Sequence, residues 1–239
     1  MPRFFKEFFE DAPFIDGADA HHIIKSLRMR VGEPLTVCDT KGVDYFCTIL
    51  DISDSRVNLK VESTAKTKSE PDVKVTLFQC LPKGDKMDSV VKQSVELGVT
   101  EITPVLSTNC VSRPDEKQLT KKIDRWQKIS CEAAGQSGRG ILPLVNQCVA
   151  LKKVAENAAK FDKVFFCYEM GGNAIAEIDS SVKNIAVIIG PEGGFTADEA
   201  EMLKAAGAVV TTLGPRILRT ETAPLAAITA IMLKTGNLG

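Results

Sequence analysis

The sequence has few of the residues that build metal centres and redox sites. Its two histidines are the neighbours His21 and His22, and none of its seven cysteines lies at C-x-x-C spacing. Because zinc sites draw their ligands from spaced Cys and His residues, we expect no bound metal. Scattered cysteines, odd in number, are typical of small core residues in a reducing cytoplasm, where we expect the protein to reside.

Long hydrophobic runs and a leader-like start are also missing. Residues 1–14 mix aromatic with charged side chains, which predicts no signal peptide. The longest apolar helical run, residues 223–233, is too short to cross a bilayer. Hydrophobic residues make up 44% of the chain and charged residues 26%, with a net charge of −1. These values predict a soluble protein with no membrane partner, in which any nucleic-acid contact uses a local basic face.

The common phosphate-binding patterns G-x-G-x-x-G and G-x-x-x-x-G-K-[ST] do not occur. In their place stand two glycine-containing loops, residues 190–195 (GPEGGF) and residues 213–222 (LGPRILRTET), each after a short apolar run. Such loops lie at the carboxyl ends of parallel strands, so we expect two strands side by side with a ligand site between them. Glycine lets backbone approach a ligand, and the negative charge of Glu192 disfavours a phosphate. Glycine backbone groups together with the apolar Ile217 and Leu218 suit a flat heterocycle such as adenine. Two tight turns without a ligand are the alternative.

The N-terminal third has the pattern of a small barrel. Residues 34–38, 45–50 and 56–61 are expected to be short strands, and the last of them alternates apolar and polar side chains. Closely spaced short strands predict a small β-barrel. Residues 63–72 are polar with a proline near their end, which is typical of a linker. We therefore expect an N-terminal domain over residues 1–70.

From residue 73 the pattern changes to alternating strands and helices, which predicts an α/β domain over residues 73–239 with a mostly parallel sheet. Thr196 and Glu199 fit a capping box, and Pro224 suits the first turn of the last helix. The expected strands are 73–81, 102–106, 164–168, 185–189 and 208–213, and the other expected helices are one capped by Asp85 and ended by Gly98 and one over 114–134.

The two late loops are similar to the signature loops of a known family. Residues 190–195 and 213–223 resemble those of the RsmE family, S-adenosylmethionine-dependent methyltransferases of 16S ribosomal RNA in the SPOUT superfamily. The resemblance covers nearly the whole chain in order, and these loops are its most specific part. The further matching segments are residues 22–29, 83–87, 92–99, 126–129 and 132–139.

This resemblance implies an architecture and an activity. The family joins a PUA-like β-barrel that binds RNA to a SPOUT α/β domain with a C-terminal trefoil knot, and its members are homodimers with the site near the subunit interface. The implied reaction is methylation of uridine N3 in the 16S rRNA of the small ribosomal subunit. The residues then expected to bind S-adenosylmethionine are Glu169, Gly190, Glu192, Gly193, Gly194, Leu213, Gly214, Ile217 and Leu218.

Methylation at N3 requires loss of a proton, because neutral uridine carries one there. The site needs a general base, or donors that stabilise charge on O2 and O4. The late loops contain no histidine, so Glu221 is the candidate base and Arg219 the candidate charge stabiliser or phosphate clamp. A salt bridge between these two residues is the alternative. The candidate RNA contacts are Arg28, Arg30, Arg113, Lys121, Lys122 and Arg139.

Other interpretations stay open at this point. Trp126 lies on an apolar helical stripe, where core or dimer packing is favoured over base stacking. One competing function is a SPOUT methyltransferase with a different RNA target. Another is a non-catalytic RNA-binding or ribosome-assembly factor, which would fail to bind S-adenosylmethionine. A nucleotide-binding α/β enzyme is the third, although the chain lacks a phosphate loop.

Overall fold

The computed structural model describes residues 1–7, 9, 13–175 and 178–238. The chain divides into two compact units. The barrel unit, as we call it, comprises residues 1–70 together with 134–142, and the sheet unit comprises residues 71–133 together with 143–239. The sequence pattern did not indicate that a segment from the middle of the chain would pack with the N-terminal strands.

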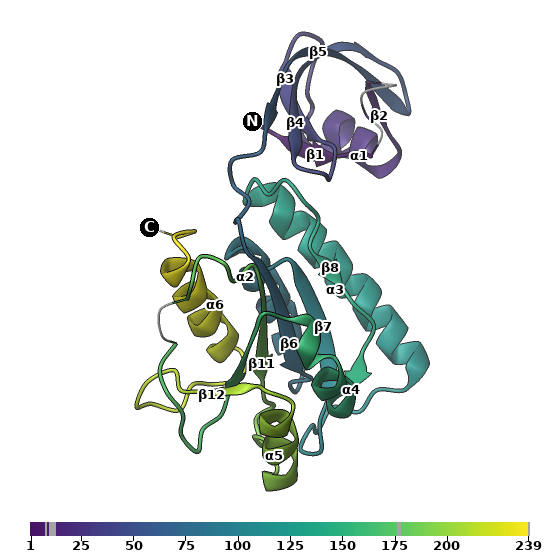
Figure 1. Cartoon of the computed structure of the whole chain (residues 1–239). Helices are drawn as coiled ribbons and strands as arrows, with labels where there is room; N and C mark the ends of the chain where they lie inside the picture. The colour runs from purple at the N-terminus through teal and green to yellow at the C-terminus, as the bar shows by residue number, and fades with distance from the viewer. Residues whose placement is uncertain (8, 10–12, 176–177, 239) are drawn as a thin grey trace. The chain divides into compact units, whose positions relative to one another are not determined.

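The described residues of the barrel unit form a five-stranded sheet in the order β1-β3-β4-β5-β2, which curls on itself (Figure 1). The pairing of β1 with β3 is parallel, and the other pairings are antiparallel. The expected strands all occur, but the expected linker is partly wrong, because β5 continues to Lys66. The strands are β1 (Arg3–Phe5), β2 (Phe14–Asp16), β3 (Pro34–Cys38), β4 (Val43–Ile52) and β5 (Arg56–Lys66), with helix α1 (Gly17–His21) and π-helix η1 (His22–Ser26) after β2.

Alternation along the strands explains the core of the barrel unit. Val57 and Leu59 on β5 are buried, and they share a hydrophobic cluster with Leu35, Val37 and Ile49. The side chains at the intervening positions face outward, because successive strand residues point to opposite faces. The strands therefore close around an apolar centre and leave polar groups on the surface.

A buried ion pair holds residues 134–142 in the barrel unit. Arg139 donates from Nε and Nη2 to the two carboxylate oxygens of Glu70, both at 2.9 Å. Glu70 Oε1 also accepts the backbone N–H of Gly140 at 2.6 Å. Arg139 is only 2% exposed. The expectation that Arg139 contacts RNA therefore does not fit the structure, since its guanidinium is buried against Glu70.

The described residues of the sheet unit form a seven-stranded sheet in which every pairing is parallel. The strand order is β12-β10-β11-β6-β7-β8, and β9 also pairs with β7. The expected strands occur with ends shifted slightly, although β12 is shorter than predicted. The strands are β6 (Lys74–Cys80), β7 (Glu101–Leu106), β8 (Leu144–Val145), β9 (Val149–Ala150), β10 (Lys163–Cys167), β11 (Asn184–Ile189) and β12 (Val209–Thr211).

One sequence-based expectation about this sheet is wrong. The strands that precede the two late loops are β11 and β12, and these are not neighbours, because β10 lies between them. The segment after β10 is therefore brought to the same edge as the two loops.

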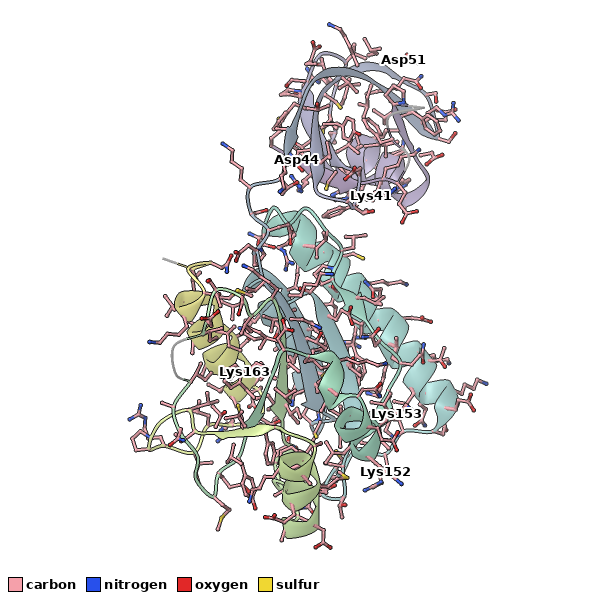
Figure 2. The ribbon with its side chains drawn as sticks, viewed as in Figure 1. Lys41, Asp44, Asp51, Lys152, Lys153 and Lys163 are labelled. Carbon is pink, nitrogen blue, oxygen red and sulfur yellow. The ribbon has the colours of Figure 1, made fainter. Side chains whose placement is uncertain are left out.

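Helices cover both faces of this sheet. The connections through α2 and α3 move along the strand order in one direction, and those through α4 and α5 move in the other. Because parallel crossovers are right-handed, the two pairs of helices lie on opposite faces. Lys152 and Lys153 of α4 point away from the sheet in Figure 2, whereas Leu151 and Val154 are buried. In the described ranges, no helix has the length and apolar character needed to span a membrane. The helices are α2 (Lys86–Glu96), α3 (Glu116–Gln136), α4 (Leu151–Glu156), α5 (Ala197–Ala205) and α6 (Ala223–Lys234), with a short 3-10 turn, η2 (Ala158–Lys160).

The predicted helix ends are mostly confirmed. The Thr196–Glu199 capping box begins α5, and Pro224 lies in the first turn of α6. Gly98 follows α2 with φ +101, the conformation expected of a glycine that ends a helix. Asp85 occupies the N-cap of α2 but makes no side-chain capping hydrogen bond, so its predicted capping role is wrong.

Candidate functional site

A cavity of about 520 Å³ lies at the carboxyl ends of β10, β11 and β12. Both late loops contribute to its wall, as the sequence predicted for a ligand site. Glu221, the predicted base, is not among the lining residues. The residues predicted to bind a cofactor all line the cavity together with Arg219, namely Glu169, Gly190, Glu192, Gly193, Gly194, Leu213, Gly214, Ile217 and Leu218.

Glycine is required at two positions of the first loop because neighbouring groups occupy the space of a side chain. A Cβ on Gly190 would lie 2.8 Å from the ring of Phe195. That ring is fixed by an edge-to-face contact with Phe166, with centroids 4.9 Å apart. Gly194 has φ +63, and a Cβ there would lie 2.2 Å from a carboxylate oxygen of Glu169. This part of the cavity wall is therefore bare backbone next to a carboxylate.

The end of β10 supplies a third side of the cavity. Glu169 is the only residue of this side that the sequence predicted. Cys167 and Tyr168 also line the cavity. The Tyr168 ring stacks on Phe166 with centroids 5.2 Å apart and an interplanar angle of 15°. The apolar run at residues 164–168 predicted this strand and is the sequence signal for the third side. Its carboxyl end lies beside the two loops because β10 pairs between β11 and β12.

A buried threonine connects the two loops. The Thr220 hydroxyl donates to the carbonyl of Gly190 at 2.7 Å and accepts from Gln79 Nε2 at 3.0 Å. Thr220 is buried, whereas Arg219 beside it is exposed and lines the cavity. These bonds fix the backbone between the two predicted catalytic residues, Arg219 and Glu221.

Lys86 links the two loops through their carboxylates. Its Nζ donates to Glu192 Oε1 at 2.9 Å and lies 3.2 Å from Glu221 Oε2. The hydrogen bond to Glu192, followed by the Glu221 carboxylate, raises the pKa of Lys86 above its ordinary value. Burial alone would raise the pKa of Glu192, but bonds from Lys86 and from backbone N–H groups lower it overall. Both charges are therefore present at neutral pH.

Lys86 is the first residue of α2, and the N-terminal end of a helix repels cations. The helix by itself therefore disfavours a lysine at this position. The two loop carboxylates compensate for that repulsion. The alternative of an Arg219–Glu221 salt bridge is not observed, since Glu221 pairs with Lys86 and Arg219 makes no ion pair within the described part of the chain.

Asn109 holds the first loop from the opposite side, and sequence reasoning missed it. Its Nδ2 donates to the carbonyls of Gly193 at 3.0 Å and Gly194 at 3.2 Å. The neighbouring Thr108 donates from its backbone N–H and its hydroxyl to Glu199 Oε1, at 2.7 and 2.9 Å. The segment after β7 thus fixes both the loop and the start of α5.

The candidate RNA contacts are distributed over both units. Arg28 and Arg30 are exposed on the barrel unit, and Arg28 has φ 53, which is uncommon for a residue other than glycine. Arg113 donates to the carbonyls of Ser107 and Thr108, at 3.0 and 2.8 Å. Lys121 and Lys122 lie on α3, where Lys121 is exposed and Lys122 half-buried.

Metal chemistry finds no support in the described residues. Among residues 1–7, 9, 13–175 and 178–238, no three His, Cys, Asp or Glu side chains come together in a way that would hold a metal ion. All seven cysteines lie in these ranges and are free thiols.

The fold and the cavity define a class of protein. Residues 68–232 match the family model of the RNA methyltransferase domain, and residues 15–62 match that of the RNA methyltransferase PUA domain. The sheet unit and its loops therefore correspond to a methyltransferase domain, and the curled sheet corresponds to a PUA domain.

Individual relatives narrow this class. Ribosomal RNA small subunit methyltransferase E of Bacillus subtilis is 35% identical, with 98% of this chain and 97% of the relative covered. The crystal structure of ribosomal RNA small subunit methyltransferase E from Neisseria gonorrhoeae bound to S-adenosyl methionine is 33% identical, with a TM-score of 0.88 over 98% of this chain and 97% of that one. The putative methyltransferase Lpg2936 of Legionella pneumophila, solved in complex with the same cofactor, is 28% identical with a TM-score of 0.88 over 98% and 97%. The chain belongs to the ribosomal RNA small subunit methyltransferase E family.

Proposed function

We propose that this protein transfers a methyl group from S-adenosylmethionine to N3 of a uridine in the 16S rRNA of the small ribosomal subunit. The reaction would take place in the cytoplasm, where that RNA is found. The observation that carries the proposal is the single cavity into which both late loops and the end of β10 bring the predicted cofactor residues. The family's name and the cofactor-bound relatives support the same reaction.

The residues of the cavity fit S-adenosylmethionine. Glycine at positions 190 and 194 lets the Phe195 ring and the Glu169 carboxylate lie close against the loop backbone, which shapes this wall of the cavity. Ile189, Leu213 and Leu218 offer apolar contacts suited to an adenine ring. The carboxylates of Glu169 and Glu192 suit ribose hydroxyls and a positively charged sulfonium group. When bound, the cofactor supplies a methyl group that is already activated for transfer.

We assign the removal of the N3 proton to Glu221. Its Oε2 is buried and lies 3.2 Å from Lys86 Nζ, the partner of its ion pair. A buried carboxylate oxygen with a free lone pair can accept a proton. Arg219 is exposed at the mouth of the cavity, where it can stabilise negative charge spreading onto O2 and O4 or hold a phosphate.

Lys86 is expected to support cofactor binding by joining the two loops. Lys86→Met should weaken S-adenosylmethionine binding on the order of tenfold, because two partly buried carboxylates would lose their shared cation. Isothermal titration calorimetry measures this dissociation constant. The matched control is Lys92→Met, which removes the same charge from an exposed position of α2. If the two variants bind equally well, the ion pairs do not shape the cavity.

Gly194 provides a second test of the cofactor wall. Gly194→Ala should weaken S-adenosylmethionine binding about tenfold or more, because the new methyl group must displace the Glu169 carboxylate. Gly207→Ala is the control, since Gly207 has φ +89 but nothing within 4 Å of its Cβ position. Both variants carry the backbone penalty, and only Gly194→Ala carries the contact. Equal affinities in a calorimetric titration would contradict the proposed role of Glu169.

We further propose the SPOUT arrangement with a C-terminal trefoil knot. The chain leaves β12 at one edge of the sheet and returns to Gly190 and Gln79, where Thr220 makes its two hydrogen bonds. It then continues into α6, which packs against α2, β6 and β11. This return path across the carboxyl ends of β10 and β11 supports the proposal of a knotted cofactor site.

We also propose a homodimer. The side of α6 that is not buried against the sheet remains largely apolar, and it carries Leu225, Ala226, Ala230 and the exposed Leu233. Ile217 on the second loop is 86% exposed, although it is apolar. Exposed apolar groups of this kind are typical of protein interfaces. Sedimentation analysis that gave only a 25.9 kDa species would contradict the dimer.

RNA binding is assigned to both domains, residues 1–70 as the PUA-like RNA-binding domain and residues 73–239 as the methyltransferase domain. Arg28, Arg30 and Arg113 carry exposed side chains. Arg28 and Arg30 would contact the RNA backbone from the barrel unit. N3 lies on the Watson–Crick edge, so the target uridine must be unpaired or flipped out of its stack.

The deciding experiment is methyl transfer from radiolabelled S-adenosylmethionine to small ribosomal subunits from cells that lack this gene. Label recovered as N3-methyluridine in 16S rRNA is the expected result. Label on another nucleoside would support a methyltransferase with a different target. No label on subunits or free rRNA, together with no cofactor binding, would support a ribosome-assembly factor.

A further inference from the structure

We propose that a recess beside the cofactor cavity, between the start of α2 and the middle of α3, binds a backbone phosphate of the substrate RNA. This inference rests on the proposed function, because it concerns the RNA that the enzyme methylates. We call this site the α2/α3 recess. It has a volume of about 210 Å³ and is lined by Gly84, Asp85, Asp88, Lys121, Lys122, Arg125 and Trp126.

The spacing of the α3 residues explains why they share this recess. Lys121 and Arg125 are four residues apart, as are Lys122 and Trp126, so both pairs lie on one side of the helix over a single turn. Two lysines and an arginine on one side of a helix repel each other unless a negative group lies among them. The α2/α3 recess is the place where such a group would sit.

Asp88 supplies only part of that negative charge. Its Oδ2 pairs with the Arg125 guanidinium, and its Oδ1 accepts from Trp126 Nε1 at 3.1 Å. Both of its oxygens are therefore engaged by α3. Neither Lys121 nor Lys122 has a carboxylate partner among the residues the structure describes, and the nearest aromatic ring to Lys122 Nζ is Trp126, at 5.9 Å from its centroid.

The charge in the α2/α3 recess is therefore positive. Three cations face two carboxylates, Asp85 and Asp88. The N-terminal end of α2 lies in the wall and adds partial positive charge. Asp85 makes no capping hydrogen bond there, so its side chain does not satisfy the first N–H groups of the helix. An anion would be bound by the two lysines with this helix end behind it.

The occupant is better described as a phosphate than as a base. Trp126 is only 3% exposed and its indole N–H is already used by Asp88, so it offers no ring face for stacking. The volume is less than half that of the cofactor cavity, about 210 against 520 Å³. A compact anion suits such a site, and lysines bind phosphate as point charges.

The position beside the cavity indicates which phosphate is bound. Gly84, Asp85 and Asp88 line the α2/α3 recess, and Lys86 from the same segment lines the cofactor cavity. Lys83 also donates its backbone N–H to Glu192 at 3.1 Å. An RNA strand that places its uridine at the cavity can therefore extend a neighbouring phosphate into the recess, where it fixes the position of the strand.

The test uses the intact protein and free 16S rRNA. The double substitution Lys121→Gln/Lys122→Gln should weaken RNA binding on the order of fivefold and reduce the slope of log K against log salt by about 1. The matched control is Lys117→Gln/Lys128→Gln, which removes two exposed lysines of α3 outside the recess. S-adenosylmethionine affinity, measured in parallel, verifies that the cavity is intact in both variants. Equal RNA affinities for the two double variants would overturn the proposal.

A footprint distinguishes RNA from a free anion. Lysine acetylation by a water-soluble reagent, read by mass spectrometry, should slow at Lys121 and Lys122 when 16S rRNA is bound. If inorganic phosphate at matched ionic strength protects both lysines and rRNA protects neither, the α2/α3 recess binds a free anion and our proposal is wrong. Neither readout requires methyl transfer. A failure of the methylation assay with retained protection would therefore reject the proposed function and keep the phosphate site.

Discussion

Glu221→Gln is expected to lower the rate of methyl transfer in a single turnover by about 10²- to 10⁴-fold, the range associated with loss of a general base. The substitution keeps the shape of the side chain and removes its ability to take the N3 proton. Lys86 would still lie beside it, and the Thr220 bonds that fix this loop do not involve the substituted group. The loss should therefore appear in the chemical step, with enzyme, cofactor and RNA already assembled.

The design of this experiment separates chemistry from binding. Rapid quenching after mixing a saturated enzyme–RNA complex with labelled cofactor, at cofactor concentrations high enough that the rate no longer depends on them, measures the rate of the chemical step. Glu201→Gln, on the exposed surface of α5 where Glu201 pairs with Lys204 at 2.8 Å, is the matched control. Lys86→Met should behave differently, because it loosens the loops and acts mainly on cofactor affinity. If Glu221→Gln retains the full rate, another group accepts the proton.

Glu70→Ala should destabilise the barrel unit by about 3–5 kcal/mol, the cost of leaving a buried charge without its partner. The Arg139 side chain is 3% exposed, and Glu70 is its bidentate partner. The same carboxylate also accepts the N–H groups of Gly140 and Ile141, at 2.6 and 3.3 Å. Its removal therefore weakens the attachment of the 134–142 segment to the barrel strands, while the bonds from Arg3, Cys38 and Ser69 to the carbonyls of that segment remain.

Hydrogen exchange of individual amides is the suitable measurement, because the chain contains two units. Amides of β3 and β4 should exchange faster in Glu70→Ala, whereas those of β6 should change little. Glu62→Ala is the control, since Glu62 pairs with Lys60 on the surface at 3.0 Å and should cost less than about 1 kcal/mol. Adding Arg139→Met to Glu70→Ala should restore part of the stability. No restoration would show that the cost does not come from the unpaired arginine.

Local pattern was sufficient to predict most elements of the sheet unit. Apolar runs between helix signals located β6, β7, β10 and β11 to within a residue or so, and the Thr196–Glu199 box located the start of α5. These features depend on neighbours within a few residues, which a single sequence displays. The loop residues that line the cavity were predicted for the same reason, because they follow strand ends directly.

The errors concern long-range order. The sequence gives each strand but not its neighbours, so β10 was not expected between β11 and β12. The Lys86–Glu192 bond joins residues 106 positions apart, and the Arg139–Glu70 pair joins residues 69 apart. No local period encodes such partners, which exist only after the units have folded. Arg139 was misassigned for this reason, since a buried arginine and an exposed one look alike in sequence.

The bonds of Thr220 have a consequence for the synthesis of this protein. Its partners, Gln79 and Gly190, precede it by 141 and 30 positions, so the cavity draws on segments made early and late in translation. Until residues 213–222 have left the ribosome, the wall that they form does not exist. A nascent or truncated chain that lacks them can therefore fold its early strands without acquiring this wall of the cofactor cavity.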